Sequence, residues 1–154
     1  MDYFTIRKAT KKDLEAVQKL NLLLFKYDVA FDETLNMNWT FSKVGTDYFN
    51  SRIESEFVYV AEANGKIIGY LAGSFNNQVS YSHEVYAELE NMFVMDEWRR
   101  HGVGKALCQE FFAQCEQRKI KSIRVTASAK NSRAVAFYKN IGFEEFDLVL
   151  KRRF

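Results

Sequence analysis

The chain has 154 residues, of which 47% are hydrophobic and 27% charged, a composition typical of one globular domain spanning residues 1–154. Its net charge of +2 is too small to indicate a nucleic-acid partner on bulk electrostatics. No long apolar segment occurs at the N-terminus. The longest aliphatic cluster, at residues 22–25, is far short of the roughly 20 residues that span a bilayer. We therefore expect a cytoplasmic protein with no membrane partner.

The first third of the chain predicts a strand followed by two helices. Alternation over residues 3–7 predicts the strand. Thr10–Asp13 resembles a capping box before a helix whose apolar face carries Leu14, Val17, Leu20 and Leu24. Residues 27–45 show no clear period, so we expect a loop or a short helix beside a site, followed by a helix near 46–55.

A β-hairpin is predicted next. Two β-rich runs, 57–63 and 66–72, flank Asn64-Gly65, which suits a type I′ turn because both central residues need positive φ. A polar loop at 76–83 then leads to a strand at 86–95.

The last third predicts a helix over 103–117, a strand over 120–127, a helix over 132–140 and a strand over 143–150. These elements define an α/β domain with a mixed central sheet, antiparallel in its N-terminal half and βαβ-like in its C-terminal half, with helices on both faces. Cys108 and Cys115 lie about 10 Å apart along one predicted helix, so they are expected to be core thiols and not a disulfide. We expect no metal site, because no pattern of metal-ligand spacing occurs.

The strand at 86–95 loses its alternation partway along. Leu89 is followed by apolar Met92, Phe93 and Val94, so the buried set changes parity. A β-bulge beside an active site explains this change, and so does a strand that is buried on both faces.

A basic, glycine-containing loop, WRRHGVGKA at 98–106, joins this strand to the next helix. The N-terminus of a helix offers unpaired N–H groups and a positive dipole, and glycines let a phosphate approach the backbone. Arg99, Arg100 and Lys105 add positive charge. The alternative interpretation is a turn that requires glycine and exposes solvated basic residues.

Neither common nucleotide-binding motif fits this loop. A Walker A loop needs glycine at 99 and serine or threonine at 106, where Arg99 and Ala106 stand, and a dinucleotide fingerprint needs glycine in place of Leu107. The segment 99–104, RRHGVG, resembles instead the acetyl-CoA loop of the GNAT family of N-acetyltransferases, Arg/Gln-x-x-Gly-x-Gly/Ala. Two flanking segments extend the resemblance in the correct order over 87–143. The segment before the loop, AELENMFVMDEWR, resembles the family's fourth strand, and the segment after it, NSRAVAFYKNIGF, resembles the family's Asn-x-x-Ala-x-x-x-Tyr-x-x-x-Gly-Phe segment.

The resemblance implies a binding site for acetyl-CoA as cosubstrate. The backbone N–H groups from His101 to Lys105 would hold the pyrophosphate, and the Phe93–Val94 backbone would pair with the pantetheine arm. The implied cofactor-binding residues are Phe93, Val94, Arg99, Arg100, His101, Gly102, Val103, Gly104, Lys105, Asn131 and Tyr138. Arg100 stands where the family often has glycine, and Asp96 stands where it often has proline.

The chemistry requires an acid and a base. For the acid that protonates the leaving thiolate we predict Tyr138, whose alternative role is a core tyrosine. For the base that accepts the proton of the amine we predict Glu90, with its pKa raised by burial or by the like charge of Glu88. The alternatives for Glu90 are a solvated face, an amine-binding carboxylate, or proton transfer to ordered water.

The predicted function is therefore direct acetyl transfer to a primary amine of a small molecule or peptide. A non-catalytic acyl-CoA-binding or partner-binding module is the alternative, and a nucleic-acid binder using Arg99, Arg100 and 151–153 is the weakest reading because no aromatic RNA-binding motif occurs. We expect a homodimer in which 143–150 pairs or packs across a two-fold axis. Residues that are candidates for lining the acceptor site are Tyr27, Asp28, Asp32, Glu33, Trp39, Tyr81 and Glu84.

Overall fold

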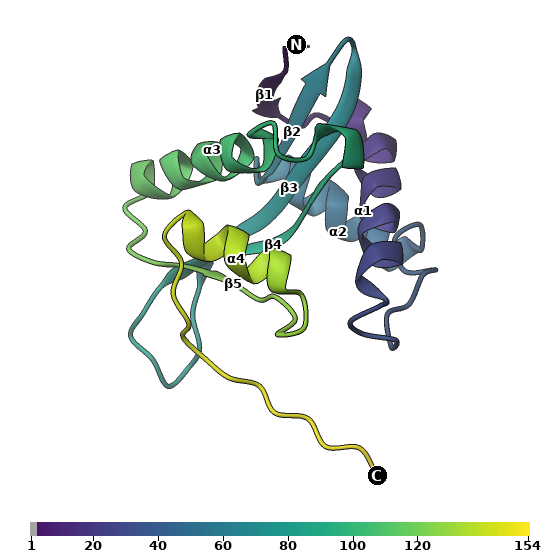
Figure 1. The fold of residues 1–154 in the computed structure, drawn as a ribbon. Helices are drawn as coiled ribbons and strands as arrows, with labels where there is room; N and C mark the ends of the chain where they lie inside the picture. The colour runs from purple at the N-terminus through teal and green to yellow at the C-terminus, as the bar shows by residue number, and fades with distance from the viewer. Residues whose placement is uncertain (1–2) are drawn as a thin grey trace.

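The computed structural model describes residues 3–154 as a five-stranded sheet in the order β1-β2-β3-β4-β5, with helices on both faces (Figure 1). Neighbours from β1 to β4 are antiparallel, and β4 and β5 are parallel, which confirms the predicted mixed α/β fold. The elements are β1 (Thr5–Lys8), α1 (Leu14–Asp28), α2 (Lys43–Glu54), β2 (Val58–Ala63), β3 (Lys66–Asn77), β4 (Tyr86–Val94), α3 (Val103–Gln117), β5 (Ile123–Val125) and α4 (Ser132–Asn140), with 3₁₀ turns η1 (Lys11–Asp13) and η2 (Asp96–Trp98).

Two apolar cores lie on opposite faces of the sheet. Helices α1 and α2 cover one face, where Val17 and Phe49 pack against Tyr70 and Phe93. Helix α3 covers the other face, and α4 lies beside it and packs against the same core. Cys108 and Cys115 are free and buried in this second core, as predicted.

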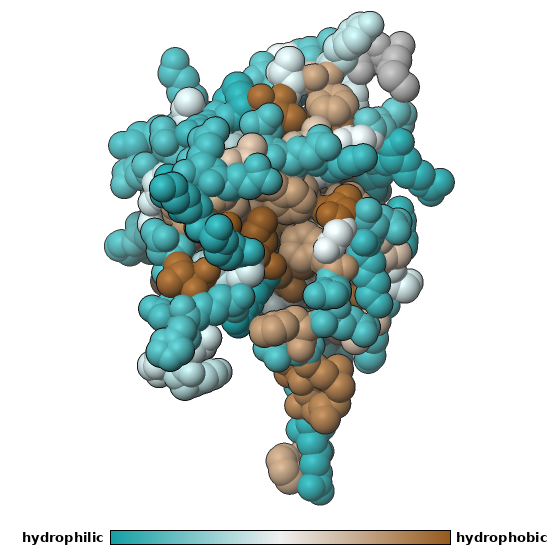
Figure 2. Space-filling view, turned by 90° about the vertical axis from the view of Figure 1, so that its left-hand side faces the viewer, coloured by the Kyte–Doolittle hydropathy of each residue, from teal (hydrophilic) through white to brown (hydrophobic). Residues whose placement is uncertain are grey.

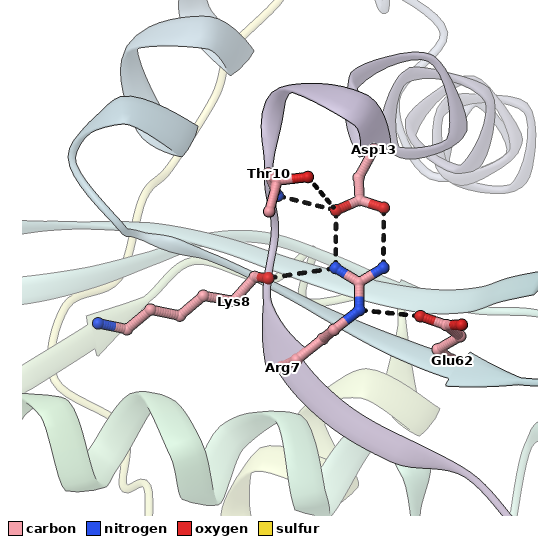
Figure 3. Close-up of polar contacts among 5 residues, drawn as sticks. All are labelled: Arg7, Lys8, Thr10, Asp13 and Glu62. Atoms are coloured by element: carbon pink, nitrogen blue, oxygen red, sulfur yellow. Dashed lines mark hydrogen bonds and ion pairs between the residues drawn. The ribbon is translucent and has the colours of Figure 1, made fainter.

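An ion-pair cluster fixes the start of α1 against the sheet edge (Figure 3). The guanidinium of Arg7 on β1 donates to both carboxylate oxygens of Asp13, at 2.8 and 2.9 Å, and its Nε donates to Glu62 on β2 at 2.8 Å. Asp13 also accepts the backbone N–H of Thr10 at 2.8 Å, the contact expected of the predicted capping box. The pKa of Asp13 is lowered because Arg7 stabilises its ionised form.

The hairpin between β2 and β3 has the predicted turn. Asn64 has φ of 50° and Gly65 φ of 73°, so both central residues occupy the left-handed region that a type I′ turn requires. Strand β3 continues to Asn77, five positions beyond the predicted end at 72. The second helix begins at Lys43 and not at 46, because the Ser42 side chain caps it by accepting the Gly45 N–H at 3.1 Å.

The largest departures from the predicted elements are at the C-terminal end. Strand β5 covers Ile123–Val125 and not 120–127, and residues 143–150 form no strand. Helix α4 ends at Asn140, Gly142 follows with φ of 106°, and the chain then extends away from the body (Figure 1). A strand requires a neighbouring strand to satisfy its backbone, and this segment has none in residues 3–154. Within those residues, no helix is both long and apolar enough to cross a membrane.

Candidate active site

A β-bulge interrupts β4 at the position where its alternation fails. In the register with β3, Ala72 pairs with Asn91 and Gly73 with Leu89, so Glu90 is the extra residue. Glu90 and Asn91 consequently both reach the α2 face, where each contacts the hydroxyl of Tyr48. The register therefore confirms the predicted β-bulge and not the alternative, a regular strand buried on both faces.

The bulge coincides with the point where β4 and β5 separate. Their parallel pairing runs from Ala87 opposite Ile123 to Leu89 opposite Val125, and β5 ends there. Beyond Leu89, β4 continues to Val94 with β3 on one side and no strand on the other in the described part of the chain. We call the resulting opening, between β4 after the bulge and the segment that follows β5, the wedge.

The basic loop after β4 presents the N-terminus of α3. Gly102 is the residue before the helix and has φ of 81°, and Arg100 also has a left-handed φ of 62°. Because glycine is the cap, no side chain caps the first turn, and its N–H groups remain available to an anion. Val103 is buried in the core and anchors the turn.

A pocket with several cationic side chains surrounds this loop. It is lined by Asp96, Glu97, Arg99, Arg100, His101 and Arg133. Arg133 comes from the first turn of α4, and sequence analysis missed it. Asn131 caps α4 by accepting the N–H of Ala134 at 3.1 Å, which places Arg133 in the first turn. The predicted βαβ order was the signal that could have identified Arg133. Because β4 and β5 are parallel, the helices that follow them, α3 and α4, both begin at the same end of the sheet.

Arg99 is partly committed to the fold. Its Nε donates to the Val94 carbonyl at 3.0 Å, and its guanidinium lies 5.1 Å from the centre of the Tyr27 ring and 5.2 Å from that of Phe93. It also pairs with Asp96 at 3.0 Å. Arg99 therefore braces the loop against β4 and α1, while Arg100 is exposed beside the start of α3.

Tyr138 lies where the two faces of the sheet meet at the wedge. Its pKa is raised by burial and, to a smaller extent, by the negative charge of Asp28, the last residue of α1, while Cys108 on the α3 side is a neutral thiol because burial raises its own pKa to about 12. Groups from both faces reach it because the separation of β5 removes the sheet between them. The ring packs against Phe137 and Phe143, with centroids 5.3 and 5.6 Å away. The hydroxyl makes no hydrogen bond within residues 3–154 and stays protonated at neutral pH.

Glu90 is held as an anion. Arg52 on α2 donates to both of its carboxylate oxygens, at 2.8 and 2.9 Å, and the Tyr48 hydroxyl donates to it as well. Burial favours the neutral acid, but the hydrogen bonds from Arg52 and Tyr48 outweigh it, so the pKa of Glu90 is lowered. The predicted rise in the pKa of Glu90 is therefore wrong. It is Glu88 whose pKa is raised, first by burial and then by the charge of Glu90.

The predicted acceptor-lining residues lie in different places. Asp28 is near Tyr138, and burial raises its pKa, whereas Tyr81 is 90% exposed on the loop after β3. The others have partners in the described residues: Tyr27 lies against Arg99, Asp32 accepts from Thr34, Glu33 pairs with Arg153, Trp39 packs on Phe25, and Glu84 binds Ser122 and Arg124.

A buried polar network that sequence analysis missed holds the segment without periodicity between α1 and α2. Thr40 donates to Asn21 at 2.7 Å, Asn21 donates to the Tyr70 hydroxyl at 2.9 Å, and Gln18 donates to the Thr40 carbonyl at 3.0 Å. The available signal was polar Gln18 and Asn21, three residues apart on the helix beside the apolar stripe.

Comparison with known proteins agrees with this geometry. The model of the acetyltransferase (GNAT) family matches residues 24–143. An uncharacterized N-acetyltransferase of Methanocaldococcus jannaschii is 30% identical over 95% of this chain and 63% of its own length, so the chain spans less than two thirds of that protein. An N-alpha-acetyltransferase of Sulfurisphaera tokodaii is 26% identical over 92% of this chain and 81% of its own length.

Solved structures show the same fold at low identity. An aminoglycoside N-acetyltransferase in complex with CoA superposes with a TM-score of 0.76 at 19% identity, covering 99% of this chain and 95% of that one.

Proposed function

Because the chain belongs to the acetyltransferase (GNAT) family, we propose that it is an N-acetyltransferase that transfers the acetyl group of acetyl-CoA directly to a primary amine. The observation that carries this proposal is the wedge. A strand that loses its neighbour at a bulge lies directly before a glycine-capped helix N-terminus, so one extended ligand has both a phosphate site and a strand edge to bind.

In this proposal the backbone amides from His101 to Lys105 bind the pyrophosphate, with Arg100 and Arg133 adding charge at the rim of the pocket. The pantetheine arm pairs along β4 at Phe93 and Val94. The Val94 carbonyl already accepts from Arg99, so the pairing uses the remaining backbone groups of this stretch. The thioester then lies in the wedge beside Tyr138.

The acceptor is proposed to be an amine of a small molecule or a peptide. A relative is named as an N-alpha-acetyltransferase, and a structural neighbour as an aminoglycoside N-acetyltransferase. The carboxylates of Asp28 and Glu88 provide negative charge near the wedge that suits an ammonium group before it loses its proton, whereas the charge of Glu90 is balanced by Arg52.

The proton transfers follow from the pKa directions. An ammonium group with a pKa near 10.4 must lose a proton before it attacks the thioester. Glu88, whose pKa is raised, accepts this proton more readily than Glu90, which Arg52 holds as a fixed anion. We therefore assign the role of base to Glu88, and assign to Glu90 the role of holding β4 at the bulge against α2 through Arg52 and Tyr48. The protonated hydroxyl of Tyr138 donates its proton to the departing thiolate.

The test is a thiol-release assay with acetyl-CoA and a panel of polyamines, aminoglycosides and peptides with free N-termini. Amine-dependent release of CoA supports the proposal. Binding of acetyl-CoA without release for any amine would instead support a non-catalytic acyl-CoA-binding module.

A further inference from the structure

A second pocket lies between α1 and the end of β4. It is lined by Leu23, Tyr27, Phe93, Met95, Asp96, Glu97 and Arg99. Its volume of about 230 Å³ is below the roughly 300 Å³ at which pockets for whole small molecules begin. The pocket therefore has the size of a subsite, which holds one group of a larger ligand.

This subsite and the pocket at the basic loop meet at η2, and the residues that they do not share set their chemistry. Both are lined by Asp96, Glu97 and Arg99. The pocket at the loop adds the basic side chains of Arg100, His101 and Arg133, which suit phosphate. The subsite adds only apolar and aromatic side chains, from α1 and β4. The first lining therefore favours a phosphate, and the second favours a hydrocarbon group.

One negative charge remains at the rim of the subsite. Arg99 and Asp96 form an ion pair at 3.0 Å, so their charges offset each other. The Arg99 guanidinium is also held against the rings of Tyr27 and Phe93. Glu97 is exposed and forms no ion pair within residues 3–154. Its carboxylate is therefore the charge that a ligand meets, and it favours a cation.

Helix α1 connects the subsite to the wedge. Leu23 and Tyr27 are four positions apart, so they share the helix face that lines the subsite. Asp28 is the next residue, turned by about 100° around the helix, and its charge acts on Tyr138 in the wedge. An amine that lies between Asp28 and Tyr138 is therefore beside the subsite, and the rest of its molecule can extend into it.

We propose that this subsite selects acceptors that carry a second cationic group on a hydrocarbon stem. The inference rests on the proposed acetyl transfer and adds the class of acceptor to it. The stem packs on Leu23, Tyr27 and Phe93, and the distal ammonium or guanidinium group pairs with Glu97. A stem that is too short leaves its second charge over the apolar lining, which is unfavourable.

Two matched series of acceptors test this selection: straight-chain monoamines from propylamine to decylamine, and the α,ω-diamines of the same lengths. For the monoamines, kcat/KM in the thiol-release assay should rise about fourfold for each methylene that enters the subsite. Short diamines should be poorer acceptors, per amine, than the monoamine of the same length. Diamines long enough to reach Glu97 should be better by about three- to fivefold, the size of one exposed ion pair. Equal kcat/KM in the two series at every length would overturn the proposal.

Filling the subsite tests where the stem binds. Leu23 is 41% exposed, so Leu23→Trp adds a ring to the subsite without entering the core, and it should abolish the rise of kcat/KM with chain length. The matched control is Leu148→Trp, at a position 77% exposed on the apolar segment after α4 that projects from the body (Figures 1 and 2), and it should keep the rise. Affinity for acetyl-CoA, measured by calorimetry, should stay within about twofold in both variants. A loss of this affinity in Leu23→Trp alone would show that the subsite holds part of the cofactor and would overturn the proposal.

Glu97→Gln tests the contact with the distal cation. The preference for the best diamine over its monoamine should disappear, through a higher KM for the diamine, because this contact is the same before and during acetyl transfer. Glu116→Gln is the matched control: Glu116 is also exposed, but it lies near the far end of α3, roughly 20 Å from the start of the helix, and its variant should keep the preference. An unchanged preference in Glu97→Gln would contradict the role of this carboxylate.

A binding measurement separates this inference from the proposed reaction. With CoA bound, octanediamine should cause saturable shifts of the backbone amide signals of Leu23 and Tyr27 in a ¹⁵N–¹H NMR spectrum, and Glu97→Gln should weaken the apparent affinity. No thiol release with any amine would count against the acetyl transfer. No shift at Leu23 and Tyr27 would overturn the subsite, whether or not the protein acetylates amines.

Discussion

The two sides of the wedge position their functional groups in different ways. On the α3–α4 side, short local motifs are sufficient: Gly102 caps α3 and Asn131 caps α4. On the α1–α2 side, groups far apart in sequence are required, as when Arg52 reaches Glu90 and Asn21 reaches Tyr70. The first side presents backbone N–H groups and a protonated hydroxyl, and the second presents fixed carboxylates. A substitution on the first side should therefore change binding or chemistry, and one that breaks a long-range contact on the second side should mainly change stability, whereas Glu88 on the second side is the exception as the proposed base.

The largest expected effect is that of Tyr138→Phe. The variant removes one oxygen, makes no change to the packed ring and deletes the proposed acid, so kcat should fall by 10²–10⁴, roughly the range for one acid–base group. Binding of acetyl-CoA should stay within about twofold, as measured by calorimetry. Tyr3→Phe is the matched control at an exposed position and should keep full activity. A near-normal kcat for Tyr138→Phe would make this tyrosine a packing residue.

The proposed base should give a different pH dependence. Glu88→Gln should lose activity at neutral pH and recover part of it at high pH, because amine that is already deprotonated then arrives from solution. Tyr138→Phe should show no such recovery, because the missing proton belongs to the leaving group. A pH–rate profile of both variants with one active amine makes the comparison, and Glu88→Gln equally depressed at every pH would exclude Glu88 as the base.

The loop between α1 and α2 should be sensitive to Gly45→Ala. An added Cβ would lie 2.1 Å from the Trp39 carbonyl oxygen and 2.7 Å from that of Thr40, so the buried loop must move. We expect a loss of about 1–3 kcal/mol in the free energy of unfolding, measured with urea. Val44→Ala, next to it but exposed, should change stability by about 0.5 kcal/mol at most. Equal stabilities of the two variants would show that the loop is loosely held.

Glu90 should make stability depend on pH. Its pKa is lowered in the folded state, so its contribution is present above the ordinary value of 4.5 and is lost as pH falls through that value toward the folded pKa. Glu90→Gln should remove this part of the acid sensitivity, and Arg52→Met should cost about 1–3 kcal/mol at pH 7 by leaving the carboxylate without its partner. Unfolding free energies measured from pH 7 to pH 4 test both expectations. Unchanged acid sensitivity in Glu90→Gln would contradict the assignment of the pair.

The smallest of these effects is that of Gly102→Val. The valine must adopt φ near 81°, and it covers the amides at the start of α3, so affinity for acetyl-CoA should fall at least tenfold, about 1.4 kcal/mol. Gly65→Val has a similar φ of 73° in a hairpin turn and is the matched control. It should cost comparable stability but leave affinity unchanged. Equal losses of affinity in the two variants would indicate a general loss of folded protein.

The same contrast between the two sides explains what the sequence could predict. The hairpin turn at Asn64-Gly65, the bulge and the start of α3 depend on neighbouring residues, so local patterns indicate them. The partner of Glu90 is 38 positions away in sequence, and no local pattern specifies Arg52. The direction of its pKa was therefore mispredicted. The prediction of a strand at 143–150 failed for a related reason, because its side chains have the alternation of a strand but no neighbouring strand lies beside it within residues 3–154.

The central claim is that acetyl-CoA binds with its pyrophosphate at the N-terminus of α3. The seven glycines of this chain provide built-in reporters, because their backbone amides fall in a separate region of a ¹⁵N–¹H NMR spectrum. A titration with acetyl-CoA should shift the signals of Gly102 and Gly104 most, while those of Gly45 in the first turn of α2 and Gly65 in the hairpin stay in place. Saturable shifts at Gly45 or Gly65 with none at Gly102 and Gly104 would contradict the account.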